Sequence, residues 1–247
     1  MRVRVGFYNV TILALLMVSV STVGQQASSN PTPSKVAFII SENFNMIDFA
    51  GPWEVFQDTV KVAPGGSTKD GEAMFELYTV AETTAPVHST GGALMTPSFS
   101  FSNAPRPDIV VIGAQPSNSP ALLDWLTKQH AQGATMMSVC TGARKLALSG
   151  LVDGLPATTH HEFLADFQTA YPKVKWQPTQ RFVKATDTIY SAGGLTSGID
   201  LALHVVAERA GNDVATRTAK WMEYESDGWK TGASSAGLKK DTPAATR

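Results

Sequence analysis

The sequence predicts one α/β domain with a mostly parallel sheet that is covered by helices on both faces. Two observations favour this fold class. Short apolar runs alternate along the chain with helical stretches, and several runs are apolar at nearly every position, as strands buried on both faces are. No internal repeat and no second compositional regime divides the 247 residues, so a single domain is expected.

Strands are predicted where a short apolar run is bounded by turn residues. Lys35 to Ile40 and Asp108 to Gly113 are such runs, and their nearly continuous apolar character is typical of a parallel sheet. Phe75 to Ala81 alternates in polarity, and Val87 to Pro97, interrupted by Gly91-Gly92, is typical of a hairpin. Further strands are expected at residues 134–139, 181–184 and 188–191.

Helices are predicted from apolar spacing together with capping signals. Gly51-Pro52 is expected to begin the first helix, over Trp53 to Val62. Proline has no amide hydrogen, and in the first turn of a helix that hydrogen would have no partner within the helix. Ser119 and Pro120 supply the N-cap and first residue of a second helix that reaches Gln132. The other helices are expected at residues 141–148, 160–171, 197–210 and 212–224.

The N-terminal end of the chain has the composition of a targeting segment. Arg2 and Arg4 precede an apolar run from Val10 to Val20, and small polar residues follow, which is the order found in a secretory signal peptide. The run is shorter than the roughly 20 apolar residues of a membrane span. An exported protein is therefore expected, periplasmic or secreted, without a stable membrane anchor after processing. The expected division is a signal peptide over residues 1–27, a linker over 28–34, the domain over 35–225 and a polar C-terminal tail over 226–247.

Charge and cysteine content exclude several kinds of site. The 20 Lys and Arg residues nearly balance 21 Asp and Glu residues and form no cluster, so a nucleic-acid partner has no electrostatic support. The single cysteine, Cys140, excludes an intrachain disulfide and every multi-cysteine zinc site. No spacing of His, Asp and Glu indicates a metal, and no Gly-rich phosphate loop follows the first strand. Neither a metal nor a cofactor is expected.

Three loops at the carboxyl ends of predicted strands are candidates for the site, because open α/β sheets bind ligands at that edge. They are Ser41 to Asp48, Gly113 to Gln115 and Cys140 to Gly142. In the third loop an apolar strand leads directly into Cys140, and Thr-Gly-Ala and a helix follow, which is the arrangement of a nucleophile elbow.

A cysteine at such a turn is expected to be reactive. The helix N-terminus would favour the thiolate, and the N–H of Thr141, with the backbone near Gly113, would hold an oxyanion. The alternative is that Cys140 is a buried apolar residue at the end of a strand.

Four blocks of sequence, in order, resemble signatures of the ThiJ/PfpI family, which belongs to the class I glutamine amidotransferase-like superfamily. They are Asp48 to Phe56, Ser138 to Ala143, Ala157 to His160 and Gly193 to Leu203. The resemblance extends from about Lys35 to Tyr224. It implies a flavodoxin-like three-layer sandwich and a homodimer.

Within that family the chain is most similar to isonitrile hydratases and to the N-terminal domains of AraC-type regulators. Thr141 after the cysteine and an aspartate, Asp48, in the first loop favour this branch. The resemblance matches Cys140, Asp48 and Thr141 to the catalytic positions of isonitrile hydratases, and makes His160 a candidate base or pocket residue. The expected oxyanion pocket contains Gly113, Ala114 and Gly142, and the expected rim contains Trp53, Arg144 and His161.

The chain departs from the family pattern at three places. Arg144 replaces an apolar residue, His161 stands where Trp is more frequent, and Gly113-Ala114-Gln115 replaces a Gly-Gly pair. Two site residues also have simpler interpretations, since Asp48 is a good N-cap for a helix that begins near Gly51, and His160 is placed to cap the helix that it begins.

The predicted chemistry is attack by the Cys140 thiolate on a small electrophilic carbon, with Asp48 moving protons and Thr141 holding the adduct. With an isonitrile, the sulfur would bond to the terminal carbon, and water would hydrolyse the thioimidate to an N-substituted formamide. A non-catalytic small-molecule-binding or sensory domain and other thiol activities of the family (glyoxalase-like, amidase or redox-protective) remain open. Only 23 residues follow Tyr224, fewer than the DNA-binding module of the similar regulators needs.

Overall fold

The computed structural model describes residues 32–63, 65–178 and 180–232. The signal peptide expected over residues 1–27 lies outside the described residues, as do most of the linker and the tail from residue 233 onward. In the part of the chain that is described, no helix has the length and apolar character needed to cross a membrane.

A seven-stranded sheet forms the centre of the domain, with strand order β12-β13-β9-β8-β1-β4-β7. Every neighbouring pair is parallel except β12 with β13, so the predicted mostly parallel α/β sheet is confirmed. All residues of β8 and β9 are buried, in agreement with their continuous apolar sequence. The strands are β1 (Ser34–Ile39), β4 (Phe75–Ala81), β7 (Phe99–Ser100), β8 (Ile109–Ile112), β9 (Thr135–Val139), β12 (Phe182–Lys184) and β13 (Ile189–Ala192).

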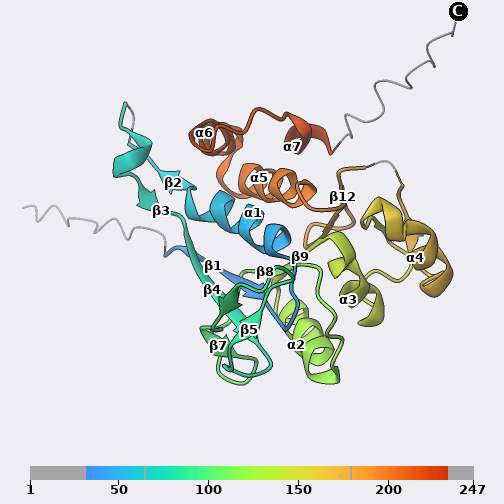
Figure 1. Ribbon diagram of the computed structural model, residues 1–247. Coiled ribbons are helices and arrows are strands. Elements are labelled where there is room, and N and C mark those ends of the chain that lie inside the picture. Colours follow the sequence, from blue (N-terminus) through green and yellow to red (C-terminus); the bar gives the residue numbers. More distant parts are fainter. Residues whose placement is uncertain (1–31, 64, 179, 233–247) are drawn as a thin grey trace, which may run out of the picture. The chain divides into compact units, whose positions relative to one another are not determined.

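Helices cover both faces of this sheet and give the three expected layers (Figure 1). Alternate residues of β1 enter different cores: Val36 and Phe38 pack with α1 and α5, whereas Ala37 and Ile39 pack with α2 and α3. The helices are α1 (Met46–Gln57), α2 (Pro120–Ala131), α3 (Ala143–Leu148), α4 (Leu164–Ala170), α5 (Ser197–Ala210), α6 (Asn212–Trp221) and α7 (Gly228–Thr231).

Helix α1 begins earlier than the sequence predicts. The side chain of Asn45 accepts hydrogen bonds from the N–H groups of Ile47 and Asp48 and caps the helix, so Pro52 lies inside it rather than in its first turn. Proline has no N–H for the Asp48 carbonyl one turn earlier, yet the helix continues to Gln57. The prediction of a helix over residues 53–62 is therefore wrong at both ends, and Asp48 belongs to the first turn instead of capping the helix.

Short elements that depend on tertiary contacts complete the domain. The predicted hairpin is present as β5 (Val87–His88) and β6 (Leu94–Met95), and a three-residue 3-10 turn, η3 (His161–Phe163), precedes α4. Phe167 of α4 is buried, whereas Phe163 at the end of η3 is exposed. The remaining short elements are β2 (Val60–Lys61), η1 (Thr68–Asp70), β3 (Glu72–Ala73), η2 (Cys140–Gly142), β10 (Pro156–Ala157) and β11 (Lys175–Trp176).

Helix α7 lies in the stretch that the sequence assigns to the polar tail. Its Trp229 is only 3% exposed and joins the core beside α5. The carbonyl of Trp229 lies 3.1 Å from Nδ1 of His204 on α5. The folded chain therefore continues beyond residue 225, because an apolar side chain there closes the layer outside α5.

Candidate active site

Cys140 stands at a sharp turn between β9 and α3. Its φ is 57°, in the left-handed region that side chains other than glycine rarely occupy, and its N–H donates to the Gly193 carbonyl at 2.8 Å. The 3-10 turn η2 begins at Cys140 and leads into α3. This is the strand–turn–helix geometry of a nucleophile elbow, at the carboxyl edge where the sequence predicts the site.

Gly142 allows this turn to lie against the end of β8. A Cβ atom built on Gly142 would lie 2.0 Å from the Ile112 carbonyl oxygen and 3.0 Å from that of Gly113. Both are backbone atoms and have little freedom to move. The role of Gly142 is therefore close packing of the turn, rather than lining of an open pocket as the sequence analysis expected.

Asp48 reaches the thiol from the neighbouring layer. Its side chain is fully buried, and its Oδ2 accepts the N–H of Ala114 at 2.9 Å. Its Oδ1 has no well-formed hydrogen bond, but the Cys140 thiol and the Leu195 amide lie close enough to the carboxyl to favour its charged form. The Asn45 N–H donates to the Ala114 carbonyl at 2.8 Å and holds the start of α1 against the loop after β8.

Burial changes the titration of both groups. It raises the pKa of Asp48 to about 6, although the Ala114 N–H and the Cys140 thiol oppose the change. Burial also raises the pKa of the Cys140 thiol to about 11, and the negative charge of Asp48 adds to this effect. Near neutral pH the resting pair is therefore a thiol and a carboxylate.

The thiolate that the sequence analysis expects at a helix N-terminus is not the resting form. Helix α3 has six residues and the 3-10 turn precedes it, so the end charge is small. Burial and the Asp48 carboxylate outweigh the amide and hydroxyl of Thr141 and the amide of Leu195, which favour the thiolate. Protonation of Asp48 removes its negative charge, which is one of the two effects that raise the pKa of the thiol.

The donors near the sulfur differ from the expected oxyanion pocket. Thr141 supplies its N–H and its hydroxyl, as expected, but the second amide belongs to Leu195 in the loop after β13. The N–H of Ala114 is occupied by Asp48, and Gly113 packs on the Asp48 side chain, where a Cβ would lie 3.0 Å from Asp48 Cβ. Gly113 and Ala114 therefore position the carboxylate instead of binding an oxyanion.

Leu195 was missed because its role depends on backbone conformation. Its φ of 54° is left-handed, like that of Cys140, and its amide acts on both the Asp48 carboxyl and the Cys140 sulfur. The available signal was the Gly193-Gly194 pair, which follows a predicted strand and so marks a fourth loop at the carboxyl edge of the sheet.

His160 caps the turn that follows it. Its Nδ1 accepts the N–H of Glu162 at 3.2 Å, which agrees with the capping alternative considered for this residue. Its ring lies against Gly194, where a Cβ would be 2.1 Å from His160 Cδ2. His160 therefore supports the loop that carries Leu195, and the described contacts do not join it to the thiol.

The three expected rim residues point to other neighbours. The Trp53 indole donates to Gln57 at 3.1 Å and packs on Phe38 at a ring distance of 4.9 Å. The Arg144 guanidinium lies 5.4 Å from the centre of the Phe167 ring. The exposed side chain of His161 pairs with Glu162 at 3.0 Å.

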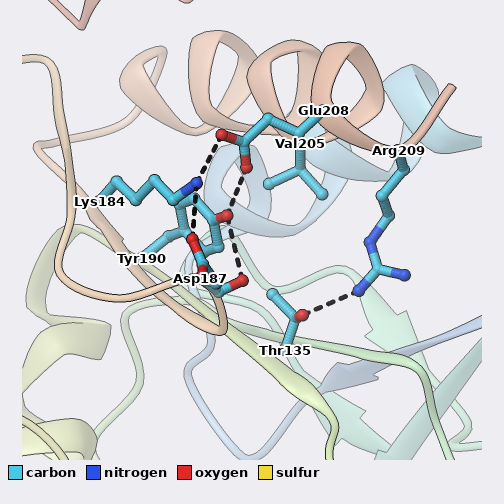
Figure 2. Close-up of a pocket in the computed structure, with 7 residues that line it drawn as sticks. All are labelled: Thr135, Lys184, Asp187, Tyr190, Val205, Glu208 and Arg209. Carbon is cyan, nitrogen blue, oxygen red and sulfur yellow. Dashed lines mark hydrogen bonds and ion pairs between the residues drawn. The ribbon is translucent and has the colours of Figure 1, made fainter. Parts of the chain in front are cut away.

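A cavity of about 400 Å³ lies at the other end of β9 (Figure 2). Lys184 pairs there with Glu208 at 2.7 Å and with Asp187 at 3.1 Å, and Arg209 donates to Thr135 at 2.8 Å. Thr135 begins β9 and Cys140 follows its end, so the length of the strand separates this cavity from the thiol. The residues drawn in Figure 2 include no nucleophilic thiol. Lys184 is paired with the two carboxylates, and Arg209 is bonded to the Thr135 hydroxyl.

The described residues contain no cluster of three or more His, Cys, Asp and Glu side chains arranged for a metal ion. The candidate site consists of Cys140, Asp48, Thr141 and Leu195, which act on one another through the carboxyl and the thiol. It has one carboxylate able to take a proton, one sulfur able to attack, and amide and hydroxyl donors beside that sulfur.

Comparison with known proteins gives one family. A model described as the DJ-1/PfpI family matches residues 34–208. The chain is 28% identical over 200 residues to the HTH-type transcriptional regulator GbdR of Pseudomonas aeruginosa, covering 79% of this chain and 52% of that protein. It is 27% identical over 198 residues to an isonitrile hydratase of Pseudomonas putida, covering 77% and 78%. The chain thus spans about half the length of the regulator.

Solved structures show the same fold. A ThiJ/PfpI family protein from Pseudomonas syringae has a TM-score of 0.66 at 23% identity, covering 79% of this chain and 76% of that chain. An AraC family transcriptional regulator from Pseudomonas putida has a TM-score of 0.65 at 20% identity, covering 77% and 100%. At these identities the likeness concerns the fold alone.

Proposed function

Because the chain belongs to the DJ-1/PfpI family, we propose that it is a cysteine-dependent enzyme that hydrates a small isonitrile to an N-substituted formamide. The observation that carries this proposal is the pairing of a buried thiol with a buried carboxylate beside the amides of Thr141 and Leu195. The isonitrile hydratase of Pseudomonas putida, 27% identical, supports the choice of substrate class.

In the first step the Cys140 sulfur attacks the terminal isonitrile carbon. The Asp48 carboxylate takes the thiol proton and delivers it to that same carbon, which gives a thioimidate bonded to the sulfur. A carboxyl group with a pKa of about 6 suits this transfer, because it is charged near neutral pH and still holds a proton long enough to return it. The Thr141 and Leu195 donors favour negative charge on the sulfur while the proton moves.

In the second step water adds to the thioimidate carbon. Asp48 again takes a proton, now from water, and passes it to the nitrogen. The carbon–sulfur bond then breaks, and the remaining hydroxyl proton goes to the leaving sulfur. The products are the N-substituted formamide and the free thiol, so that one isonitrile and one water are consumed in each cycle. The chain needs no oxidant or reductant for this sequence.

The experiment is turnover of a small alkyl isonitrile, with the formamide measured by chromatography and the adduct on Cys140 by mass spectrometry. We expect Cys140→Ala to lose activity and Cys140→Ser to keep the fold without turnover. Because the chain has one cysteine, any mass increase on the wild type that is absent from Cys140→Ala locates the adduct. Wild-type activity in Cys140→Ala would overturn the mechanism.

A second candidate is a ligand-binding domain without turnover. The 28% identity to the regulator GbdR favours it, and so does a resting thiol whose pKa is raised to about 11. Saturable binding of the isonitrile by calorimetry, with neither formamide nor adduct, would identify this function. Steady formation of formamide would exclude it.

We also propose that the protein is exported and forms a homodimer. The signal-like composition of residues 1–27 supports export, and the family resemblance supports a dimer. N-terminal sequencing of the protein recovered outside the cytoplasm and light scattering of the purified chain test the two proposals separately.

A further inference from the structure

Lys145 is a buried cation on the helix that follows the nucleophile. Its side chain is 1% exposed, and lysine is almost never buried so deeply without an acidic partner. The ion pairs of the described residues do not include Lys145. Its Nζ donates to the main-chain carbonyl of Gln115, and this bond leaves hydrogens of the ammonium group without a partner in the structure.

The position of Lys145 connects two parts of the site. Gln115 directly follows Ala114, whose N–H holds the Asp48 carboxylate at 2.9 Å. Through its bond to the Gln115 carbonyl, Lys145 therefore holds the loop that positions Asp48, which accepts the thiol proton. The side-chain Oε1 of Gln115 is itself buried without a hydrogen bond, so a spare acceptor lies on the same residue that Lys145 contacts.

The charged groups that act on Lys145 are few. Burial lowers the pKa of Lys145 to about 8, and the positive charge of Arg144, which precedes it on α3, adds to this effect. The Cys140 thiolate has the opposite effect and favours the ammonium form. When the ammonium and the thiolate are both present, their opposite charges attract, so a charged Lys145 favours negative charge on the sulfur.

We propose that Lys145 is a positioning residue for the nucleophile, whose ammonium holds the Gln115 loop and stabilises the sulfur when the thiol proton moves to Asp48. The proton transfer moves one negative charge from the carboxylate to a sulfur that is buried among apolar side chains. A cation buried nearby on α3 reduces the cost of that movement, and it does so without touching the substrate. The inference rests on the proposed use of Cys140 as a nucleophile.

The test is the rate of alkylation of Cys140 by iodoacetamide between about pH 6 and pH 10, the rising part of the profile below the raised pKa of this thiol, where the rate follows the thiolate fraction. Cys140 is the only cysteine, so the label reports on this sulfur alone. We expect Lys145→Met to react about tenfold more slowly near neutral pH and its profile to move to higher pH. The matched control is Arg144→Met, which removes one positive charge from the same helix but from a side chain that lies over Phe167, and its profile should move less.

Lys145→Met should remain folded, because replacing an unpaired buried charge with an apolar side chain of similar length is often neutral or stabilising. If this variant does not fold, Lys145→Arg and Lys145→Gln replace it. Lys145→Arg keeps the positive charge and should have the wild-type pH profile of alkylation, whereas Lys145→Gln should move the profile to higher pH. A folded Lys145→Met, or a folded Arg and Gln pair, with the wild-type profile would overturn the inference. Alkylation needs no isonitrile, so the two proposals can fail separately. If no isonitrile is hydrated but the alkylation profile of Lys145→Met is shifted, the proposed substrate is wrong and the role of Lys145 is supported.

Discussion

The carboxyl of Asp48, in the first turn of α1, faces the thiol of Cys140 at the end of β9, and burial raises the pKa of both groups. Backbone amides of two other loops act on these groups. The Ala114 amide binds the carboxylate, and the Leu195 amide favours negative charge on the sulfur. The two side chains therefore hold a single negative charge between them near neutral pH. The pH and the substrate determine whether this charge is on the Asp48 carboxylate or on the Cys140 sulfur.

Activity should rise with pH as Asp48 loses its proton. Burial raises the pKa of Asp48 to about 6, and only the carboxylate can accept the thiol proton. The value of kcat/KM for the isonitrile should therefore increase through about pH 6 and be lost below about pH 5. Measurement of initial rates across this range tests the prediction, and a rate that does not change between about pH 5 and pH 7 would contradict it.

Asp48→Asn should increase stability near neutral pH while lowering kcat at least about 100-fold. The folded-state pKa is raised from 3.8 to about 6, so this group stabilises the fold fully below the lower value, and the contribution is lost as the pH rises through the higher one. Near pH 7 the neutral amide should raise the free energy of unfolding by roughly 2–3 kcal/mol.

Urea unfolding at about pH 4 and about pH 7 measures this difference, which should nearly vanish at the lower pH. Asp213→Asn, at an exposed position on α6, is the control and should change stability little at either pH. Equal stabilisation by Asp48→Asn at both pH values would show that burial does not act on the charge of Asp48.

Gly142→Ala should disrupt the elbow. The added Cβ would lie 2.0 Å from the Ile112 carbonyl oxygen, so the turn and β8 must separate, and a loss of more than about 3 kcal/mol is expected. Gly150→Ala is the matched control: its φ is 73° but nothing lies within 4 Å of the new Cβ, so only backbone strain of about 1 kcal/mol is added. Similar unfolding midpoints for the two variants would contradict the assigned packing role.

Gly194→Ala should lower activity through His160. The new Cβ would lie 2.1 Å from His160 Cδ2, so either the ring or the loop that carries Leu195 must move. His160→Ala alone should cost about 1 kcal/mol of stability through the lost cap and change kcat less than about threefold.

The double variant Gly194→Ala/His160→Ala removes the clash and should recover most of the activity that Gly194→Ala loses. A double-mutant cycle in kcat measures this coupling. A large loss of kcat in His160→Ala with an intact fold would instead identify His160 as the catalytic base.

The sheet and most helices could be predicted because their signals are local. Continuous apolar runs marked β1, β8 and β9, and the Ser119-Pro120 pair marked the start of α2. The start of α1 was misplaced because Gly51-Pro52 is a strong signal, whereas the N-cap at Asn45 becomes decisive only when its N–H also bonds to Ala114. Trp229 was missed for a similar reason, since its burial depends on α5, which is distant in sequence.

The candidate site was predictable in its side chains but not in its backbone. The strand that ends at Cys140 and the loop that contains Asp48 are visible in the sequence, and the structure brings these side chains together. The second amide donor could not be identified, because nearly every residue has an N–H and only the folded path of the loop after β13 brings that of Leu195 to the site. Lys145 was missed because a lysine beside Arg144 looks like a solvated surface pair, and its burial follows from the direction of α3 alone.

Cys140 and Leu195 both have left-handed backbone conformations although neither is glycine, and the Leu195 amide acts on the Cys140 sulfur. Such conformations cost roughly 1–3 kcal/mol each and persist only where the surrounding fold enforces them. The site is thus preorganised before any ligand arrives, and little conformational entropy remains to be lost on binding. Affinity for a small ligand should consequently depend on how well the ligand fits a fixed set of donors, and tolerance for substrates of varied shape should be narrow.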